Sequence, residues 1–315
     1  MSVVPIAAAK SAEACANCGK ESSDIVKLRN CTACYLVKYC SVDCQKNHLK
    51  KHKKACKERA AEFKDEKLYG QGHERPAFGY CPICFLAIPI RTQDHSVFYS
   101  CCMKSVCDGC CIMAFEQGYG ADCPFCRTPE AENDDLVLGM IQKRVAARDP
   151  IAIRRLGDFH LTGECGLEKN TTRALELWTE AAELGSMEAL FKLGIAVHQG
   201  ELGVAQDEIK GIRYWEAAAM QGCAESRHML GFVELKNSNC DRAVRHFLIS
   251  AKMGFKDSLD KIKEMFANGH ATKAQYAEGL TGYQDAVEAM KSPERDKALA
   301  TFGAQHDALK AFTGR

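Results

Sequence analysis

The feature that most constrains this chain is the uneven placement of its cysteines. The 315-residue sequence holds 19 of them, and all but Cys165, Cys223 and Cys240 precede residue 127. Many stand in Cys-x2-Cys pairs, a spacing that lets both thiolates of one short loop reach a single Zn²⁺ without straining the backbone. The odd total and the lack of a recognisable secretion signal argue against a disulfide framework. The first third of the chain is therefore predicted to fold around zinc.

The first cysteine cluster supplies eight candidate donors, enough for two tetrahedral Zn²⁺ ions. They are Cys15, Cys18, Cys31, Cys34, Cys40, Cys44, His52 and Cys56. Three residues separate the members of each of the last two pairs, so on a helix both members project from one face. His48, one turn before His52, is an alternative donor, and its other interpretation is a solvated helix residue.

This segment resembles the MYND zinc finger over residues 15–56, on the strength of Tyr39-Cys40-Ser41, Cys44-Gln45 and the His52 to Cys56 spacing. The resemblance implies two interleaved zinc sites. One would be formed by Cys15, Cys18, Cys40 and Cys44, and the other by Cys31, Cys34, His52 and Cys56.

The resemblance also implies that the segment binds proteins. MYND fingers hold short proline-containing peptides beside the Cys-Gln element, which makes Gln45 a candidate partner-binding residue. Leu49 stands where those fingers usually carry tryptophan, so the flat aromatic surface on which a proline ring would stack is missing. Partner binding is expected, without the family's preference for proline.

A second cluster supplies eight further donors, which are Cys81, Cys84, Cys101, Cys102, Cys107, Cys110, Cys123 and Cys126. In this order and spacing the cluster resembles an all-cysteine RING finger over residues 80–128. The resemblance implies a cross-brace, with the first and third pairs on one Zn²⁺ and the second and fourth on another. His95 is an alternative to the adjacent Cys101 and Cys102, because neighbouring side chains in an extended segment point in opposite directions and need a turn to share an ion.

RING fingers do no covalent chemistry themselves, because they only hold a ubiquitin-charged conjugating enzyme so that its thioester is well placed for amine attack. The resemblance places Ile83, Pro124 and Arg127 at positions that matter for this docking. A guanidinium at Arg127 offers a rigid fork of donors that can bridge the enzyme and ubiquitin. The tryptophan that many active RING fingers carry between the sixth and seventh ligands is absent. Two interpretations stay open, a ligase-like adaptor and a zinc-stabilised interaction module that meets no conjugating enzyme.

The remainder of the chain is repetitive. The dipeptides Leu156-Gly157, Leu193-Gly194 and Leu230-Gly231 recur at intervals of 37 residues, and each is followed by an aromatic residue, two alanines or one, and a glycine. Small residues allow close helix approach and glycine ends helices, so the unit is a helical hairpin. It resembles the Sel-one-like repeat, a relative of the tetratricopeptide repeat.

Charge and composition exclude several functions. Forty-two basic and 41 acidic side chains leave a net charge of +1, so the chain lacks the excess of positive charge typical of a dedicated nucleic-acid binder. The basic run of residues 50–59 is interpreted as the solvated face of a ligand helix. No apolar stretch reaches the roughly 18–20 residues of a membrane span. No glycine-rich phosphate loop and no catalytic residue is identified, so no small-molecule substrate is expected.

The sequence thus predicts a mostly α protein, with two small cross-braced zinc modules followed by an all-α helical-hairpin solenoid. The expected order is a MYND-type finger over 15–56, a linker over 57–79, a RING-type finger over 80–128, a connector helix over 129–148, Sel-one-like repeats over 149–269 and capping helices over 270–315. About four Zn²⁺ ions are expected. The predicted function is an intracellular, cytoplasmic or nuclear, zinc-binding protein-interaction protein, a ubiquitin-ligase-like adaptor or alternatively a non-enzymatic scaffold for assembling protein complexes.

Overall fold

The structure, a computed structural model, describes residues 14–90 and 94–301. The chain forms two compact units, Met1–Gly70 and Gln71–Arg315, and each is described by itself. Residues 302–315, which belong to the predicted capping segment, lie outside the described part of the chain. No helix of the described residues is long and apolar enough to span a membrane.

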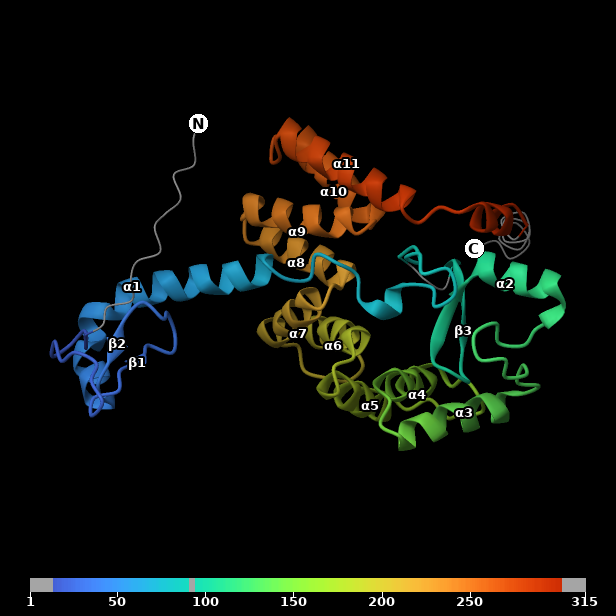
Figure 1. The fold of residues 1–315 in the computed structure, drawn as a ribbon, viewed down its shortest axis with the longest axis horizontal. Coiled ribbons are helices and arrows are strands. Elements are labelled where there is room, and N and C mark those ends of the chain that lie inside the picture. The colour runs from blue at the N-terminus through green and yellow to red at the C-terminus, as the bar shows by residue number, and fades with distance from the viewer. Residues whose placement is uncertain (1–13, 91–93, 302–315) are drawn as a thin grey trace. The chain divides into compact units, whose positions relative to one another are not determined.

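The first unit combines a two-stranded ribbon with one long helix (Figure 1). Strands β1 (Arg29–Asn30) and β2 (Lys38–Tyr39) pair antiparallel and present the first cysteine loops. Helix α1 (Val42–Tyr69) begins at Ser41, whose hydroxyl accepts a hydrogen bond from the Cys44 backbone N–H. This cap satisfies a donor at the start of the helix. The helix continues through most of the predicted linker and ends at Gly70.

The second cysteine segment opens the second unit. It contains the short helix η1 (Ala77–Gly79), strands β3 (Ser96–Tyr99) and β4 (Lys104–Cys107), helix α2 (Asp108–Ala114) and the π-helical turn η3 (Phe115–Tyr119). Strands β3 and β4 pair antiparallel. Cys81, Ile88, Val106 and Cys107 form its small buried core. With so few apolar residues, a module of this size needs cross-links such as metal ions.

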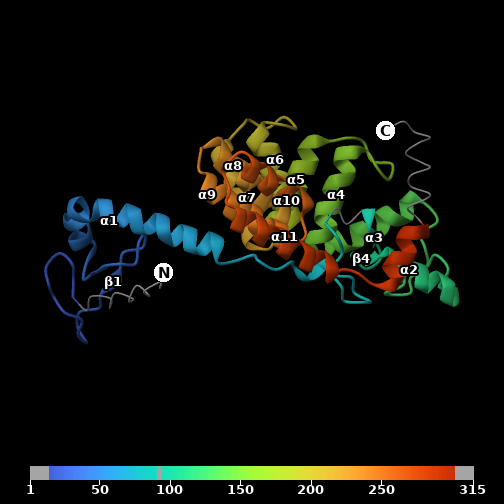
Figure 2. The ribbon, with the colours of Figure 1, turned by 90° about the horizontal axis from the view of Figure 1, so that it is seen from above.

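Helices stack as antiparallel hairpins through the rest of the unit, which is the predicted solenoid (Figures 1 and 2). They follow helix α3 (Asp134–Ala146), whose N-cap is Asn133. The repeat helices are α4 (Pro150–Thr162), α5 (Thr171–Glu183), α6 (Met187–Gln199), α7 (Glu208–Met220), α8 (Ala224–Lys236), α9 (Cys240–Lys252), α10 (Lys256–Ala267) and α11 (Lys273–Glu288). A final helical segment covers residues 293–301.

The recurring glycine explains the period of the repeats. A Cβ on Gly157 would lie 2.7 Å from Cδ1 of Trp178, and the glycines of the next two copies face Trp215 and Phe247 in the same way. Each glycine therefore lets the first helix of a hairpin lie directly against the large aromatic of the second. The aromatic side chains are 0–3 % exposed, so these contacts form the interior of the solenoid.

The second cysteine segment shares a core with the first hairpin. Met103 is buried and Phe98 half-buried in one cluster with Ile141 of α3 and Ile153 of α4. The guanidinium of Arg155 stacks over Phe98 at 5.2 Å, which covers the edge of this cluster. Because apolar side chains from both segments are removed from water together, the segment is built onto the repeats.

Candidate zinc centres and interaction surfaces

The structure brings sixteen cysteine and histidine side chains into four groups of four. In each group the candidate ligand atoms all lie within 4.8 Å of one another. The groups are Cys15, Cys18, Cys40 and Cys44; Cys31, Cys34, His52 and Cys56; Cys81, Cys84, Cys107 and Cys110; and Cys101, Cys102, Cys123 and Cys126. These are the interleaved groupings that the two resemblances imply.

Sulfur separations test whether these groups fit zinc. Cys18 and Cys40 lie 3.5 Å apart, Cys31 and Cys56 3.7 Å, and Cys84 and Cys107 3.7 Å between their Sγ atoms. A disulfide would require about 2.05 Å. Tetrahedral coordination with Zn–S bonds of about 2.3 Å puts neighbouring sulfurs about 3.8 Å apart. The spacings and the donor types therefore fit structural Zn²⁺, and the clusters are consistent with several bound ions.

The pKa values of the cysteine thiols also fit bound Zn²⁺. Burial opposes ionisation of Cys15, but backbone N–H groups around it outweigh burial and lower its pKa to about 6. The balance of the same causes lowers the pKa of Cys31 to about 6. By contrast, hydrogen bonds with Cys18 and Cys44 stabilise the protonated form of the Cys40 thiol and raise its pKa to about 12. A divalent cation bound among the sulfurs would favour their thiolate form and allow all four to ionise together.

A turn between β3 and β4 resolves how adjacent cysteines share one group. Met103 has a φ of 56°, and its backbone N–H donates to the Tyr99 carbonyl at 2.9 Å. The backbone therefore reverses at this point, and both Cys101 and Cys102 face the last cysteine pair. His95, the alternative donor, belongs to none of the four groups formed by the described residues.

Two residues near the ligands have structural roles. Nδ1 of His48 lies 3.1 Å from the Tyr39 hydroxyl, and its ring stacks on His52 with centroids 5.8 Å apart. His48 thus supports a ligand from outside the group. Cys111 donates to the Val106 carbonyl at 3.6 Å, and burial raises the pKa of its thiol to about 11, so it stays a neutral packing residue.

Candidate partner-binding residues differ in their exposure. Ile83 is 38 % exposed, and Gln45 is half-buried on α1. Arg127 is exposed, with a φ of 62°, and its guanidinium stacks 3.5 Å from the ring centroid of Tyr119. Pro124 is buried, so its side chain shapes the last cysteine loop from inside.

Two arginines far apart in the sequence clasp the loop that follows Cys84. Arg75 donates to the carbonyls of Ile88 and Met253, which joins this loop to the end of α9. Arg295 donates to the carbonyls of Leu86 at 3.1 Å and Ala87 at 2.6 Å, and its Nη2 lies 3.5 Å from Cys84 Sγ. A guanidinium beside a thiolate cluster offsets its negative charge.

The glycine between the clustered cysteines of α2 has a steric reason. A Cβ on Gly109 would lie 2.8 Å from the backbone of Glu294 and Arg295. The C-terminal segment therefore packs directly on the third cysteine pair. Neither this approach nor the two arginines was predicted, because isolated arginines carry no motif that points to their acceptors.

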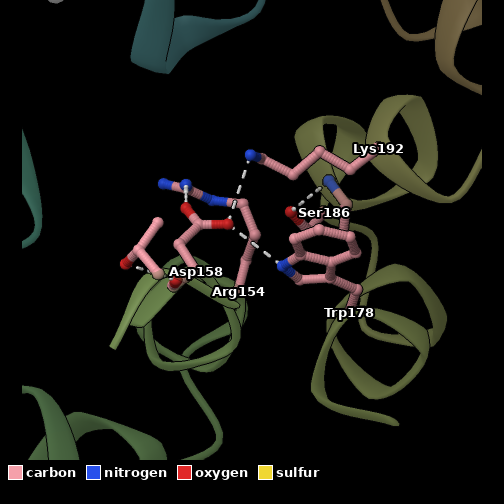
Figure 3. A network of polar contacts seen from close by, with 7 residues as sticks. Arg154, Asp158, Trp178, Ser186 and Lys192 are labelled. Atoms are coloured by element: carbon pink, nitrogen blue, oxygen red, sulfur yellow. Dashed lines mark hydrogen bonds and ion pairs between the residues drawn. The ribbon is translucent and has the colours of Figure 1, made fainter. Parts of the chain in front are cut away.

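A polar network at the first two hairpins was also missed (Figure 3). Asp158 accepts hydrogen bonds from Arg154 and from Trp178 Nε1 at 3.0 Å, and Lys192 lies 3.2 Å away. The carboxylate thereby ties α4 to α5 and α6. The four-residue spacing of Arg154 and Asp158 was the one available signal, since it places an ion pair on one helix face.

Comparison with known families identifies two of the modules. The model of the MYND finger matches residues 15–56, and that of the Sel1 repeat matches residues 150–186, 188–223 and 227–255. The chain carries a MYND finger and Sel1 repeats. The resemblances to the MYND finger and to the Sel-one-like repeat are thus confirmed, and so is the expected fold class of zinc-binding modules followed by a helical solenoid. With these modules the chain is a zinc-binding protein that interacts with other proteins.

The solved structures that match parts of this chain are distant from it in sequence. A Sel1 repeat protein from Oxalobacter formigenes is 20 % identical, with 58 % of this chain and 72 % of that one covered and a TM-score of 0.45. The protective antigen c5321 of uropathogenic Escherichia coli is 18 % identical, with 63 % and 41 % covered and a TM-score of 0.44. The immunity protein Pa5087 of Pseudomonas aeruginosa is 15 % identical, with 56 % and 65 % covered and a TM-score of 0.36. No curated protein matches the chain.

Proposed function

We propose that residues 80–128 form a RING-type finger and that the protein is a ubiquitin-ligase-like adaptor, with the MYND finger and the Sel1 repeats recruiting partners. The observation that carries the proposal is the crossed grouping of the second cluster. Its first and third cysteine pairs meet, and so do its second and fourth. Such interleaving ties distant segments into one rigid platform, which is what a docking module requires.

The exposed residues of this platform support a docking role. Ile83 offers an apolar contact beside the first cysteine pair, and Phe115 at the end of α2 is 67 % exposed. Tyr119 holds the guanidinium of Arg127 by stacking, which limits its rotamers before any partner arrives. In the proposed complex Arg127 bridges the conjugating enzyme and ubiquitin, and the protein accelerates transfer by orientation alone.

The remaining parts divide the work in the proposed protein. The MYND finger over 15–56 and the repeats over 149–269 choose partners, residues 129–148 connect, and residues 270–315 cap the solenoid. The ligands would be the sixteen residues of the four groups, with no covalent catalytic residue. Reduced thiolate ligands suit a reducing compartment, so we propose action in the cytoplasm or nucleus.

Self-ubiquitination by the zinc-loaded full chain tests the proposal. Purified protein is incubated with activating enzyme, ubiquitin, ATP and a panel of conjugating enzymes. We expect chains with the wild type, and a loss of at least about tenfold in Ile83→Ala and Arg127→Ala, because each removes a contact made during transfer.

Matched controls are Ile209→Ala and Arg173→Ala, whose parent side chains are exposed on the repeats. Zinc content and helical circular dichroism of every variant are measured to exclude misfolding. Equal activity of the Ile83 and Arg127 variants, or silence of the wild type across the panel, would overturn the ligase assignment.

A second candidate function is a scaffold without enzymatic activity. The observation in its favour is that Phe98 and Met103 bury the second cysteine segment in the core of the first hairpin. This segment would then serve to anchor and end the solenoid. The self-ubiquitination assay separates the two, since only the adaptor requires a conjugating enzyme.

A further inference from the structure

A segment of this chain packs against the turn between α7 and α8. Residues 71–76, called the strap, run past the α7–α8 turn (Figure 1). The buried Arg227 of α8 donates to the Gln71 carbonyl. Gly72 would collide with the backbone of the α7–α8 turn if it carried a Cβ, and Gly222 of that turn would collide with the Glu74 carbonyl. The α7–α8 turn therefore accommodates the backbone of another segment in direct contact, with no side chain between them.

A groove continues beyond the strap, between the second cysteine segment and helices α4, α6 and α8. Its volume is about 1460 Å³. Small-molecule pockets span about 300–1,000 Å³, so this groove has the capacity for several residues of an extended chain. Aromatic side chains of both parts line it: Phe78, Tyr80 and Phe85 come from the second cysteine segment, and Phe191 comes from α6.

Most charged groups in the groove already have partners. Arg75 is bound to two carbonyls, and Arg154 and Lys192 both engage Asp158 (Figure 3). The Arg155 guanidinium lies 5.2 Å from the ring centroid of Phe98 and 5.3 Å from that of Phe159. Lys104, which also lines the groove, lies 4.8 Å from the Phe125 ring centroid. These basic side chains are therefore in contact with groups of the protein itself.

Two carboxylates are the exception. Glu188 and Glu225 are the second residues of α6 and α8, one repeat apart, and both line the groove half-buried. Neither forms an ion pair within 4 Å among the described residues, although Cys223 Sγ donates to Glu225 at 3.6 Å. Burial raises the pKa of Glu188, the charge of Arg154 offsets part of this rise, and the charge of Glu225 adds to it. Arg75 likewise acts on Glu225 from beyond ion-pair distance. A cation placed beside both would relieve this repulsion.

We propose that this groove binds an extended segment of a partner protein that places a lysine or arginine side chain beside Glu188 and Glu225. Apolar residues of the segment pack against Phe78, Tyr80 and Phe191, and its backbone continues the path of the strap. The inference rests on the proposed partner-recruiting role of the repeats and is independent of ubiquitin transfer.

Binding to an oriented peptide library tests the inference. The probe is a set of immobilised nonapeptides with one fixed central residue and random flanks, incubated with zinc-loaded full-length protein without conjugating enzyme or ATP. We expect pools with central lysine or arginine to bind about fivefold to tenfold more protein than pools with central glutamine or glutamate, as a half-buried charged hydrogen bond would provide.

The double variant Glu188→Gln/Glu225→Gln should lose this preference while keeping its zinc content and helical signal. Asp241→Asn is the matched control, because it removes a first-turn carboxylate from α9, outside the groove. Phe191→Ala should weaken all pools alike. Equal binding of lysine and glutamine pools, or a preference that survives the double variant, would overturn the inference. Silence in ubiquitin transfer would leave it intact, so the two failures are distinguishable.

Discussion

Replacing Gly194 by alanine has two effects of opposite sign on the free energy of unfolding, and the structure lets us compare their sizes. At an exposed position inside a helix, alanine is more favourable than glycine by about 1 kcal/mol. In α6, however, a Cβ on Gly194 would overlap Nε1 and Cδ1 of Trp215 and lie 3.0 Å from its Cε2. Trp215 is fully buried, and its Nε1 donates to the Phe191 carbonyl at 3.3 Å. It therefore has no free space into which to move.

The expected net effect is destabilisation. Overpacking a close-packed core costs about 1–3 kcal/mol, and displacing the indole hydrogen bond costs about 1 kcal/mol more. Subtracting the helix-propensity gain leaves a loss of about 2 kcal/mol. Gly139→Ala is the matched control, because nothing lies within 4 Å of a Cβ built at that position of α3. We expect it to stabilise by about 0.5–1 kcal/mol.

Urea unfolding in zinc-replete buffer measures both variants. The sequence contains two tryptophans, Trp178 and Trp215, both in the repeats, so tryptophan fluorescence reports on the solenoid while circular dichroism follows total helix. If Gly194→Ala were as stable as the wild type, or gained stability like Gly139→Ala, the steric explanation of the repeat glycine would be refuted.

Four further outcomes are expected. Chelation should unfold residues 15–56, since each structural zinc supplies about 10–16 kcal/mol of apparent folding free energy, and proteolysis followed by mass spectrometry would detect it. Arg295→Met should speed zinc release to a colorimetric chelator and lower the free energy of unfolding by about 1–2 kcal/mol. Arg295→Lys should keep part of the stabilisation that the arginine provides. Unchanged zinc release in Arg295→Met would refute the role of Arg295 in holding the loop after Cys84. Asp158→Asn should lower the thermal stability of the repeats by about 1–2 kcal/mol, read from circular dichroism, because two cations lose their shared carboxylate. Burial lowers the pKa of His246 to about 3, so as the pH drops the unfolded state binds a proton on this residue before the folded state does. The free energy of unfolding therefore falls as the pH drops from about 6.5 towards 3. Near pH 5.5 the loss should be about 1.4 kcal/mol, and it should vanish in His246→Gln.

Local spacing explains what could be predicted from the sequence. Metal ligands recur at short intervals because one loop or helical turn must present two donors to one ion, as in Cys15 and Cys18. The 37-residue period survives in the sequence because every hairpin solves the same packing problem with the same glycine and aromatic pair. Extension of α1 beyond Cys56 to Tyr69 was not predicted, although its cause is local, since no glycine or proline interrupts that stretch.

The sequence by itself thus predicted the candidate zinc donors of the MYND finger, because their pairs are closely spaced in the chain. It also determined the helical hairpins and their order, because these follow from contacts between near neighbours. Only the tertiary structure decided which surfaces meet. It brought Arg75 and Arg295 to one cysteine loop, set the second cysteine segment on the core of the first hairpin, and left Glu188 and Glu225 facing a groove. Such contacts join residues far apart in the chain, and they depend on the summed packing of many elements, which leaves no periodic or local mark in the sequence.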